Sequence, residues 1–204
     1  MKLEVKDSSI SGKLEVVWEL GWGKHIKAGG LTQSGGVAEL IWRDSLKKVY
    51  GSNRSVKKIL ILGLGGGSIA KLTRKLWQDP EITGVEIDPV MVDLGSRHLG
   101  LNKTGVKVKI QDALEFCKKC KDKFDLICID TYVGDQFPKK FEEDKFLKTI
   151  LKLLNKNGIA VFNRLYYDEK RPQAVKFGKK LEGIFPKVLW HYPEANVMFL
   201  CYNI

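Results

Sequence analysis

The feature that most constrains the fold is an apolar run that leads directly into a glycine-rich turn, residues 58–68, with the sequence KILILGLGGGS. Glycines at a G-x-G-x-G spacing, Gly63, Gly65 and Gly67, permit a tight turn and let the backbone approach a ligand closely. The next segment has the pattern of a helix, whose first N–H groups suit a ligand at the turn. The turn predicts a nucleotide-type site, and taken alone it also fits a dinucleotide dehydrogenase.

The rest of the chain alternates short apolar runs with helical segments, the pattern of a parallel sheet with crossover helices. The expected strands are almost continuously apolar, as strands buried on both faces are. They cover 58–64, 82–87, 106–110, 124–129 and 159–163. The expected helices cover 69–77, 89–99, 113–121, 145–154 and 173–184. Asn157-Gly158 is expected to end the fourth helix before the fifth strand begins.

The last two apolar runs, 188–191 and 196–202, are joined through Pro193, Glu194 and Ala195. Such a short link cannot hold a parallel crossover, so it predicts an antiparallel hairpin. We therefore expect an α/β protein with a mostly parallel sheet that ends in an antiparallel strand.

Residues 1–57 have a different pattern. Leu14, Val16, Trp18 and Leu20 alternate with a second set of residues, which predicts a strand with one apolar face. Glycine-rich breaks then suggest a small β-meander, followed by a helix that leads into the sheet. Because this segment is too small for an independent core, we expect it to pack as an appendage on the main domain, residues 58–204.

The composition is that of one globular domain: 204 residues, 44% hydrophobic and 29% charged. No apolar run is long enough to span a bilayer, and the first residues lack the apolar core of a secretory signal, so we expect a cytoplasmic protein without membrane contacts. The net charge of +11 would attract nucleic acid or an acidic substrate. The sequence contains no named nucleic-acid-binding motif, and we interpret most of the lysines as solvated helix faces.

Cys117 and Cys120 have the spacing of a metal or redox pair. They fall in an expected helix, and the sequence lacks a second Cys/His pair at zinc-ligand spacing. We therefore predict no metal site.

Acidic residues end or follow successive expected strands. Glu86 ends the second strand, where a carboxylate can accept hydrogen bonds from ribose hydroxyls, whereas Asp88 precedes a proline as a helix N-cap does. Asp112 follows the third strand and suits either a helix cap or a hydrogen bond from an adenine amino group. Asp130 follows the fourth strand. Since the carboxyl ends of the strands meet at one crevice, Gly63 and these carboxylates predict a nucleoside ligand.

Several motifs, in order along the chain, resemble those of spermidine synthases and their methyltransferase-like relatives. They are GLGGGSIA at 63–70, GVEIDP at 84–89, QDA at 111–113 and FDLICID at 124–130. The resemblance covers about residues 30–163 and implies the class I S-adenosylmethionine-dependent methyltransferase fold, in which the sheet is doubly wound and seven-stranded. It also implies S-adenosylmethionine or its decarboxylated form as cofactor, with Glu86 at the ribose and Asp112 at the adenine end. The candidate cofactor-binding residues are Gln33, Gly63, Gly65, Gly66, Gly67, Glu86, Ile87, Asp112, Ala113 and Asp130.

The sequence departs from the spermidine synthase pattern where the acceptor substrate is expected. Those enzymes carry an Asp-x-x-Asp motif after the fourth strand; here Asp130 matches the first position, Val133 occupies the second, and Asp135 lies two residues later. Gly66 stands where those enzymes usually have an aspartate. Because a polyamine pocket should be rich in carboxylates, these departures argue against a polyamine acceptor.

We therefore expect a transferase that moves a methyl group from S-adenosylmethionine to an acceptor that the sequence does not identify. Asp130 is the candidate for orienting the acceptor or removing its proton, with Tyr132 and Asp135 as further candidate catalytic residues. Two alternatives stay open: an aminopropyltransferase that uses decarboxylated S-adenosylmethionine and a polyamine, and a non-catalytic nucleoside- or nucleic-acid-binding protein. The sequence also leaves a homodimer open.

Overall fold

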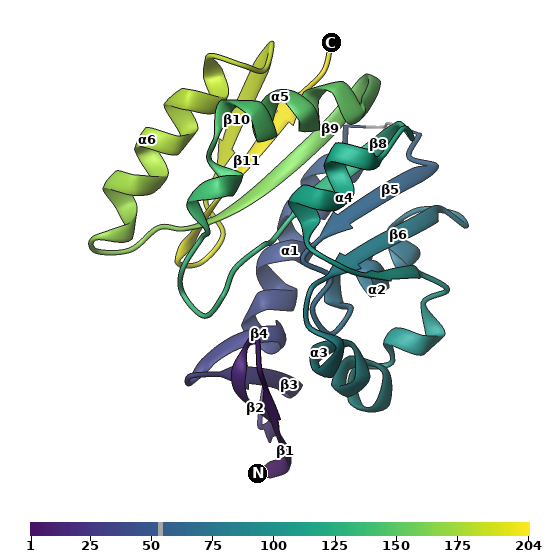
Figure 1. The fold of residues 1–204 in the computed structure, drawn as a ribbon, viewed down its shortest axis with the longest axis vertical. Helices are drawn as coiled ribbons and strands as arrows, with labels where there is room; N and C mark the ends of the chain where they lie inside the picture. Colours follow the sequence, from purple (N-terminus) through teal and green to yellow (C-terminus); the bar gives the residue numbers. More distant parts are fainter. Residues whose placement is uncertain (53–54) are drawn as a thin grey trace.

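The computed structural model describes residues 1–52 and 55–204, which form two sheets connected by α1 (Gly36–Tyr50) (Figure 1). The remaining two residues belong to the segment that we expect to form the appendage and lie outside the described residues. In Figure 1 the smaller sheet lies at one end of the molecule, next to the N-terminal half of α1.

The larger sheet has seven strands in the order β10-β11-β9-β8-β5-β6-β7. β11 is antiparallel to both of its neighbours, and the other adjacent pairs are parallel. The predicted α/β class, the doubly wound sheet and the reversed last strand are confirmed. The strands are β5 (Lys58–Leu62), β6 (Glu81–Glu86), β7 (Lys107–Ile110), β8 (Phe124–Ile129), β9 (Leu154–Leu165), β10 (Lys187–His191) and β11 (Asn196–Tyr202).

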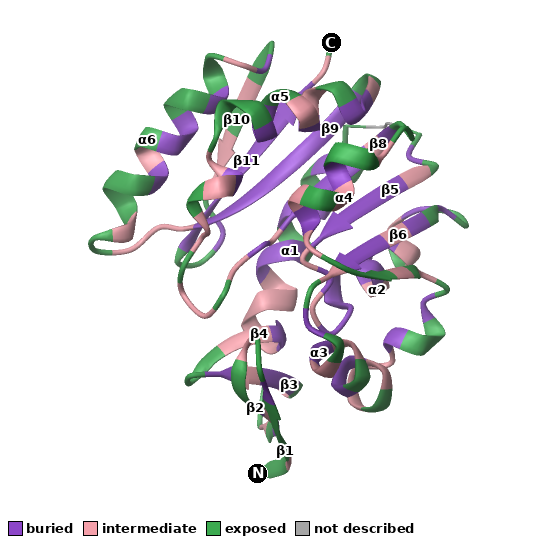
Figure 2. Cartoon of the chain, in the orientation of Figure 1, coloured by how far each residue is buried: buried purple, intermediate pink, exposed green. Residues whose placement is uncertain are grey.

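Helices cover both faces of this sheet, and the central strands are buried between them (Figure 2). On β5, Ile59 and Ile61 belong to a core cluster with residues of α1 and α2, whereas Leu60 and Leu62 belong to a second cluster with residues of α4, α5 and α6. This double burial explains the continuous apolar runs in the sequence.

In the described part of the chain, no helix is both long and apolar enough to cross a membrane. The helices after α1 are α2 (Ser68–Leu76), α3 (Pro89–Leu94), α4 (Ala113–Lys119), α5 (Asp144–Leu153) and α6 (Lys170–Glu182).

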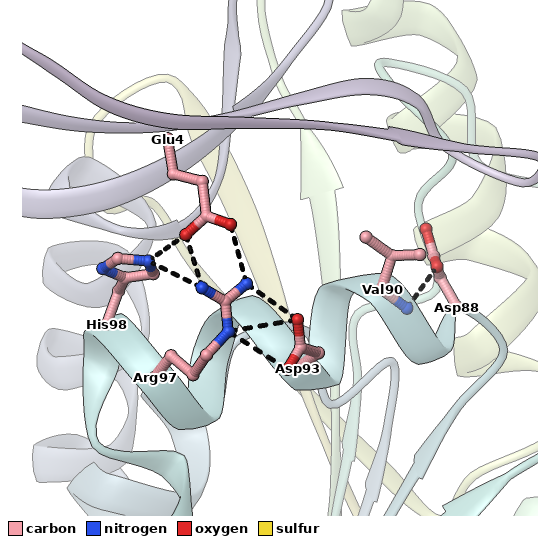
Figure 3. Close-up of polar contacts among 6 residues, drawn as sticks. All are labelled: Glu4, Asp88, Val90, Asp93, Arg97 and His98. Atoms are coloured by element: carbon pink, nitrogen blue, oxygen red, sulfur yellow. Dashed lines mark hydrogen bonds and ion pairs between the residues drawn. The ribbon is translucent and has the colours of Figure 1, made fainter.

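The smaller sheet is an antiparallel meander in the order β1-β2-β3-β4, as the glycine breaks suggest. Its apolar face packs on α3 and on the π-helical turn η1 (Gly95–Leu99) that follows it. On the same side, Glu4 accepts hydrogen bonds from Arg97 and pairs with His98, which ties β1 to η1 (Figure 3). The strands are β1 (Lys2–Ser8), β2 (Gly12–Glu19), β3 (Gly23–Ala28) and β4 (Leu31–Gly35).

The predicted apolar face of β2 is wrong at its far end. Leu14 and Val16 are buried as expected, but Trp18 is 42% exposed and Leu20, just after the strand, is 87% exposed. Val17, which belongs to the second set of this alternation, is buried and lies opposite the buried His25 of β3. The alternation fails because only the first half of β2 reaches the core under the sheet.

Asn157-Gly158 does not end a helix, contrary to our expectation. α5 already ends at Leu153, and β9 begins with the next residue. The pairing of β9 with β8 shifts register between Leu154 and Ile159, so the Asn-Gly pair lies in an irregular turn within the strand. Asn157 has a φ of 64°, which explains the turn-forming residues at this position.

Candidate active site

A cavity of about 400 Å³ opens at the carboxyl ends of the central strands. From β5 the chain proceeds to β6 and β7 on one side, and from β8 it proceeds to β9 on the other, so the strand order reverses between β5 and β8. Ligands of open α/β sheets bind at such a point. The cavity is lined by one or more residues at or after each of five strands: Gly63, Gly65, Glu86, Asp112, Asp130 and Asn163.

Gly63 is required where β5 meets β8. It has a φ of 82°, and a Cβ atom on it would lie 2.1 Å from the backbone oxygen of Asp130. A side chain is therefore excluded both by the conformation and by the contact. This close approach brings the glycine turn and the end of β8 together at the cavity.

Gly66 and Gly67 do not line the cavity, so their assignment to the cofactor site is not supported. A Cβ atom on Gly66 would lie 2.7 Å from Leu99, and one on Gly67 would lie 2.6 Å from Leu101. These two glycines allow the turn to pack against the segment after α3. The periodic glycine motif therefore combines cavity residues and packing residues.

Glu86 points its carboxylate at the glycine turn. One oxygen accepts a hydrogen bond of 2.8 Å from the Gly65 N–H, and the other accepts bonds of 2.8 and 3.0 Å from the N–H groups of Ile87 and Asp88. Burial raises the pKa of Glu86 above its ordinary value, although these three backbone bonds favour the charged form. Ile87 also lines the cavity. Asp88 is the predicted N-cap: its Oδ1 accepts a 2.9 Å bond from the Val90 N–H (Figure 3).

Asp112 caps α4, accepting hydrogen bonds from the N–H groups of Leu114 and Glu115 through one carboxylate oxygen. Its other oxygen pairs with Lys140, which comes from the segment after β8. Burial acts to raise the pKa of Asp112, but the hydrogen bond and charge of Lys140, together with the N–H groups of Glu115 and Leu114, outweigh it, so the pKa is lowered. Asp112 and Ala113 both line the cavity. The cap, one of the two roles left open, is thus observed, and the carboxylate still faces the cavity.

Asp130 lies in the cavity wall and accepts two hydrogen bonds from side chains. The Trp42 Nε1 donates to Oδ2 at 2.6 Å, and the Asn163 Nδ2 donates to Oδ1 at 2.9 Å. Burial raises the pKa of Asp130, while the bonds from Asn163 and Trp42 act in the opposite direction. The geometry gives an oriented carboxylate that protonates more readily than an exposed one.

Three cavity residues of this network were missed by the sequence analysis: Trp42, Asn163 and Asn196. Asn196, the first residue of β11, donates a 2.7 Å hydrogen bond to the Oδ1 of Asn163. Asn163 carried a usable signal, because it is a polar residue at the end of an otherwise apolar run. Trp42 had none, since a tryptophan on a helix facing a sheet predicts only core packing.

Tyr132 lines the cavity, and its hydroxyl accepts a 2.8 Å hydrogen bond from the Leu165 N–H. Burial raises its pKa, so the phenol is neutral at physiological pH. Asp135 is not brought to the cavity. Its carboxylate pairs with Lys170 at 2.8 Å, and that hydrogen bond lowers its pKa, so the structure does not support Asp135 as a base in this site.

Gln33, predicted from the resemblance, lines the cavity from β4, and its Nε2 donates a 3.4 Å hydrogen bond to the Gly134 oxygen. Thr131, which the analysis did not select, lies beside Asp130 and is only 8% exposed. Among the described residues, the Thr131 hydroxyl has no hydrogen-bond partner, although it is in a residue that lines the cavity. The hydroxyl oxygen is itself buried, so it does not face the open space of the cavity.

The sequence predicts no metal site, and this stays a prediction. Cys117 and Cys120 are free thiols, and burial raises the pKa of Cys117 to about 12. Within residues 1–52 and 55–204, no group of three or more His, Cys, Asp or Glu residues is placed to hold a metal ion.

The model of one protein family, the spermine/spermidine synthase domain, matches residues 45–193. The chain belongs to this family. The resemblance found in the motifs is therefore confirmed, and the matched region contains the glycine turn, Glu86, Asp112 and Asp130.

Curated relatives of this spermine/spermidine synthase domain include two kinds of transferase. A polyamine aminopropyltransferase of Vibrio vulnificus is 29% identical over 136 residues, 62% of this chain and 46% of the relative. An eEF1A lysine and N-terminal methyltransferase homolog of Drosophila melanogaster is 27% identical over 157 residues, 72% of this chain and 23% of the relative. The chain therefore spans less than half of the length of each.

Solved structures similar to this family member also fall into two kinds. The spermidine synthase from Thermotoga maritima superposes with a TM-score of 0.83 at 18% identity, covering 100% of this chain and 73% of that one. Human methyltransferase-like protein 13 in complex with SAH gives 0.62 at 21% identity, covering 81% and 78%. At these identities the likeness shows the fold, which agrees with the predicted Rossmann-like methyltransferase architecture.

Proposed function

We propose that the chain binds S-adenosylmethionine, or its decarboxylated form, in the cavity and transfers a group from it to an acceptor. The observation behind this proposal is Glu86. Three backbone N–H groups orient its carboxylate at the cavity edge. Oε2 accepts only the bond from Gly65, so it keeps a lone pair for a hydroxyl of a ribose. The complex of the human structural neighbour with SAH supports a ligand of this class.

The other cavity residues fit the rest of such a ligand. Asp112, Ala113 and Ile87 form an edge suited to an adenine ring and its amino group. The Gln33 side chain, which lines the cavity from β4, offers an amide to the polar end of the cofactor. When bound, the sulfonium cofactor supplies an electrophilic carbon attached to positively charged sulfur.

In this proposal Asp130 orients the acceptor and holds its proton. Trp42 and Asn163 fix the carboxylate, so that ordering it costs nothing when the acceptor binds. The raised pKa of Asp130 brings a carboxyl closer to the range where it can accept a proton from an acceptor. Tyr132 contributes a neutral hydroxyl to the same wall.

We propose methyl transfer as the first candidate reaction. Val133 lines the cavity where spermidine synthases carry their second acceptor carboxylate, and Asp135 is paired with Lys170 outside the cavity. The groups around Asp130 are neutral: an indole, an amide and a phenol. This lining suits an acceptor with little positive charge better than a polyamine.

Aminopropyl transfer to a polyamine is the second candidate. The aminopropyltransferase relatives favour it, and so does Glu194, an additional acidic residue that lines the cavity from the turn between β10 and β11. A cationic acceptor in this reading would contact Asp130 and Glu194.

Calorimetric titration of the chain with S-adenosylmethionine and with its decarboxylated form tests these proposals. Tighter binding of the first supports methyl transfer, tighter binding of the second supports aminopropyl transfer, and no binding of either overturns both. Glu86→Ala should weaken binding by about 1–3 kcal/mol through the lost ribose hydrogen bonds. Glu81→Ala, at the exposed start of the same strand, is the matched control and should bind as the unaltered chain does. Equal affinities for both variants would remove Glu86 from the site.

A further inference from the structure

A second cleft, of about 390 Å³, lies on a different face of α1 from the cavity. Val37 and Ile41 line the cavity, whereas Glu39 and Arg43 line the second cleft. Residues four apart share a face of a helix, so each site uses its own face of α1. The cleft is completed by the turn between β2 and β3, by Lys71 of α2 and by η1.

The cleft has an excess of positive charge. Lys24, Arg43 and Lys71 line it against a single carboxylate, Glu39. The spacing of Glu39 and Arg43 would let them pair along the helix, but Glu39 instead pairs with Lys71 at 2.9 Å. Within the described residues, the side chains of Arg43 and Lys24 form no hydrogen bond or ion pair. Two cations therefore remain available to an anion.

His98, which also lines the cleft, is already engaged. It pairs with Glu4 at 2.5 Å, and Glu4 in turn accepts two hydrogen bonds from Arg97 (Figure 3). These contacts hold η1 against β1 and define one wall of the cleft. The unpaired cations thus face a wall that is fixed by its own ion pairs.

An exposed aromatic ring stands beside these cations. Trp22 lines the cleft and is 45% exposed at the tip of the β2–β3 turn. Gly21 and Gly23 on either side have φ values of 82° and 66°, which produces the tight turn that presents the indole. Trp18, on the neighbouring strand β2, is also exposed, at 42%. Cations combined with exposed aromatic rings are the features that bind single-stranded nucleic acids.

We propose that this cleft binds a single-stranded nucleic acid, with phosphates at Lys24 and Arg43 and a base stacked on Trp22. An acidic peptide would satisfy the cations without necessarily supplying a ring, whereas every nucleotide carries a base that can stack on the indole, which favours the nucleic acid. The net charge of +11 assists the encounter with a polyanion. The proposal uses no residue of the cavity and is independent of the transferase proposal.

Fluorescence anisotropy of a labelled ten-nucleotide oligouridine, titrated with the full chain at several salt concentrations, tests the proposal. We expect the logarithm of the association constant to fall linearly with the logarithm of the salt concentration. Arg43→Ala should weaken binding and reduce the salt slope by about 0.7, the value for one phosphate contact of a single strand. Trp22→Ala should weaken binding roughly 5- to 150-fold through lost stacking. Arg43→Lys, which keeps the charge, should restore most of the salt slope.

Lys148→Ala provides the matched control, because this exposed lysine of α5 lies outside the cleft and carries the same charge. Binding that is weakened by the cleft variants and not by Lys148→Ala supports the proposal. Equal weakening by Lys148→Ala would show a general charge effect and overturn it. Displacement of the oligouridine by polyglutamate at equal charge, together with unchanged oligouridine binding by the Trp22→Ala variant, would overturn the proposal in favour of an acidic protein. Uridine monophosphate, tested as a competitor, distinguishes a nucleic acid strand from a free nucleotide as the ligand. If the monophosphate displaced the oligomer at an equal concentration of nucleotides, the proposal of a nucleic acid strand would be overturned.

Discussion

The Trp42 indole donates a 2.6 Å hydrogen bond to the Asp130 carboxylate across 88 positions of the sequence. This bond connects the helix that leads into the larger sheet with the end of β8, and it crosses the wall of the cavity. The two residues come from the two segments that we expected to be an appendage and a main domain. The cavity is therefore built from both segments.

Trp42→Phe keeps the apolar packing and removes the indole donor. We expect it to lower the free energy of unfolding by about 1–3 kcal/mol at neutral pH, because a charged acceptor loses a partner. The loss should shrink as the pH falls, since the bond favours the ionised form of Asp130 and its removal raises the pKa of that carboxyl further. Urea denaturation at several pH values measures both effects. Trp77→Phe is the control, because the buried Trp77 Nε1 has no partner among the described residues. An equal loss of stability in this variant, with the same dependence on pH, would contradict the role of the Trp42–Asp130 hydrogen bond.

Gly63→Ala should be strongly destabilising. The added Cβ would meet the Asp130 backbone oxygen at 2.1 Å, and the φ of 82° disfavours any side chain. We expect a loss of about 3 kcal/mol or more in urea denaturation. Gly134→Ala, with a φ of 61° and open space around its Cβ position, should cost only the conformational strain of about 1–2 kcal/mol. Similar losses at the two positions would argue against the close contact between β5 and β8.

Asp112→Ser separates the two roles of Asp112. Serine is a good N-cap, so α4 and the unfolding temperature should change little, and the ion pair with Lys140 is a partly exposed one of small value. If the carboxylate accepts a hydrogen bond from adenine, affinity for S-adenosylmethionine should fall by about 1–3 kcal/mol in calorimetry. Asp112→Ala should lose both affinity and about 1 kcal/mol of stability. Unchanged affinity for the serine variant would leave the cap as the only role of Asp112.

The Glu4 ion pairs make the attachment of the smaller sheet depend on pH (Figure 3). Hydrogen bonds from Arg97 and then His98 lower the pKa of Glu4 to about 2 from an ordinary value near 4.5. The folded-state pKa lies below the unfolded-state value, so the contribution is present above pH 4.5 and is lost as the pH falls toward 2. We expect Glu4→Gln to be less stable than the unaltered chain at pH 6 and equally stable near pH 2.

Thermal unfolding from pH 7 to pH 2 measures this difference. Glu143→Gln is the control, because Glu143 is exposed and forms no ion pair in the described part of the chain. A Glu4→Gln difference that persists unchanged at pH 2 would show that the ion pairs do not cause it.

The sequence allowed the sheet, its reversed strand and most strand ends to be predicted, because burial on both faces requires continuous apolar runs and a three-residue link requires a hairpin. Glu86 and Asp130 could be placed at the cavity because they end strands whose order reverses between them. The role of Asp88 followed from the proline after it, and the structure confirms that cap.

Other parts of the site could not be predicted, because they depend on contacts between distant segments. The donors to Asp130 come from a helix and from another strand, and nothing local marks Trp42 as a hydrogen-bonding residue. Gly66 was assigned to the cofactor site because its motif is periodic, whereas its close neighbour Leu99 is 33 positions away and has no local mark in the sequence. Asn157 looked like a helix stop because the same residue type also suits a turn within a strand.

The bond from Asn196 to Asn163 has a consequence for synthesis of the protein. β11 lies next to β9 in the sheet but follows every other strand along the chain. The amide that orients Asp130 therefore gains its own partner only after residues 196–202 have left the ribosome. The order of the strands therefore makes this side of the cavity wall the last to be completed during synthesis.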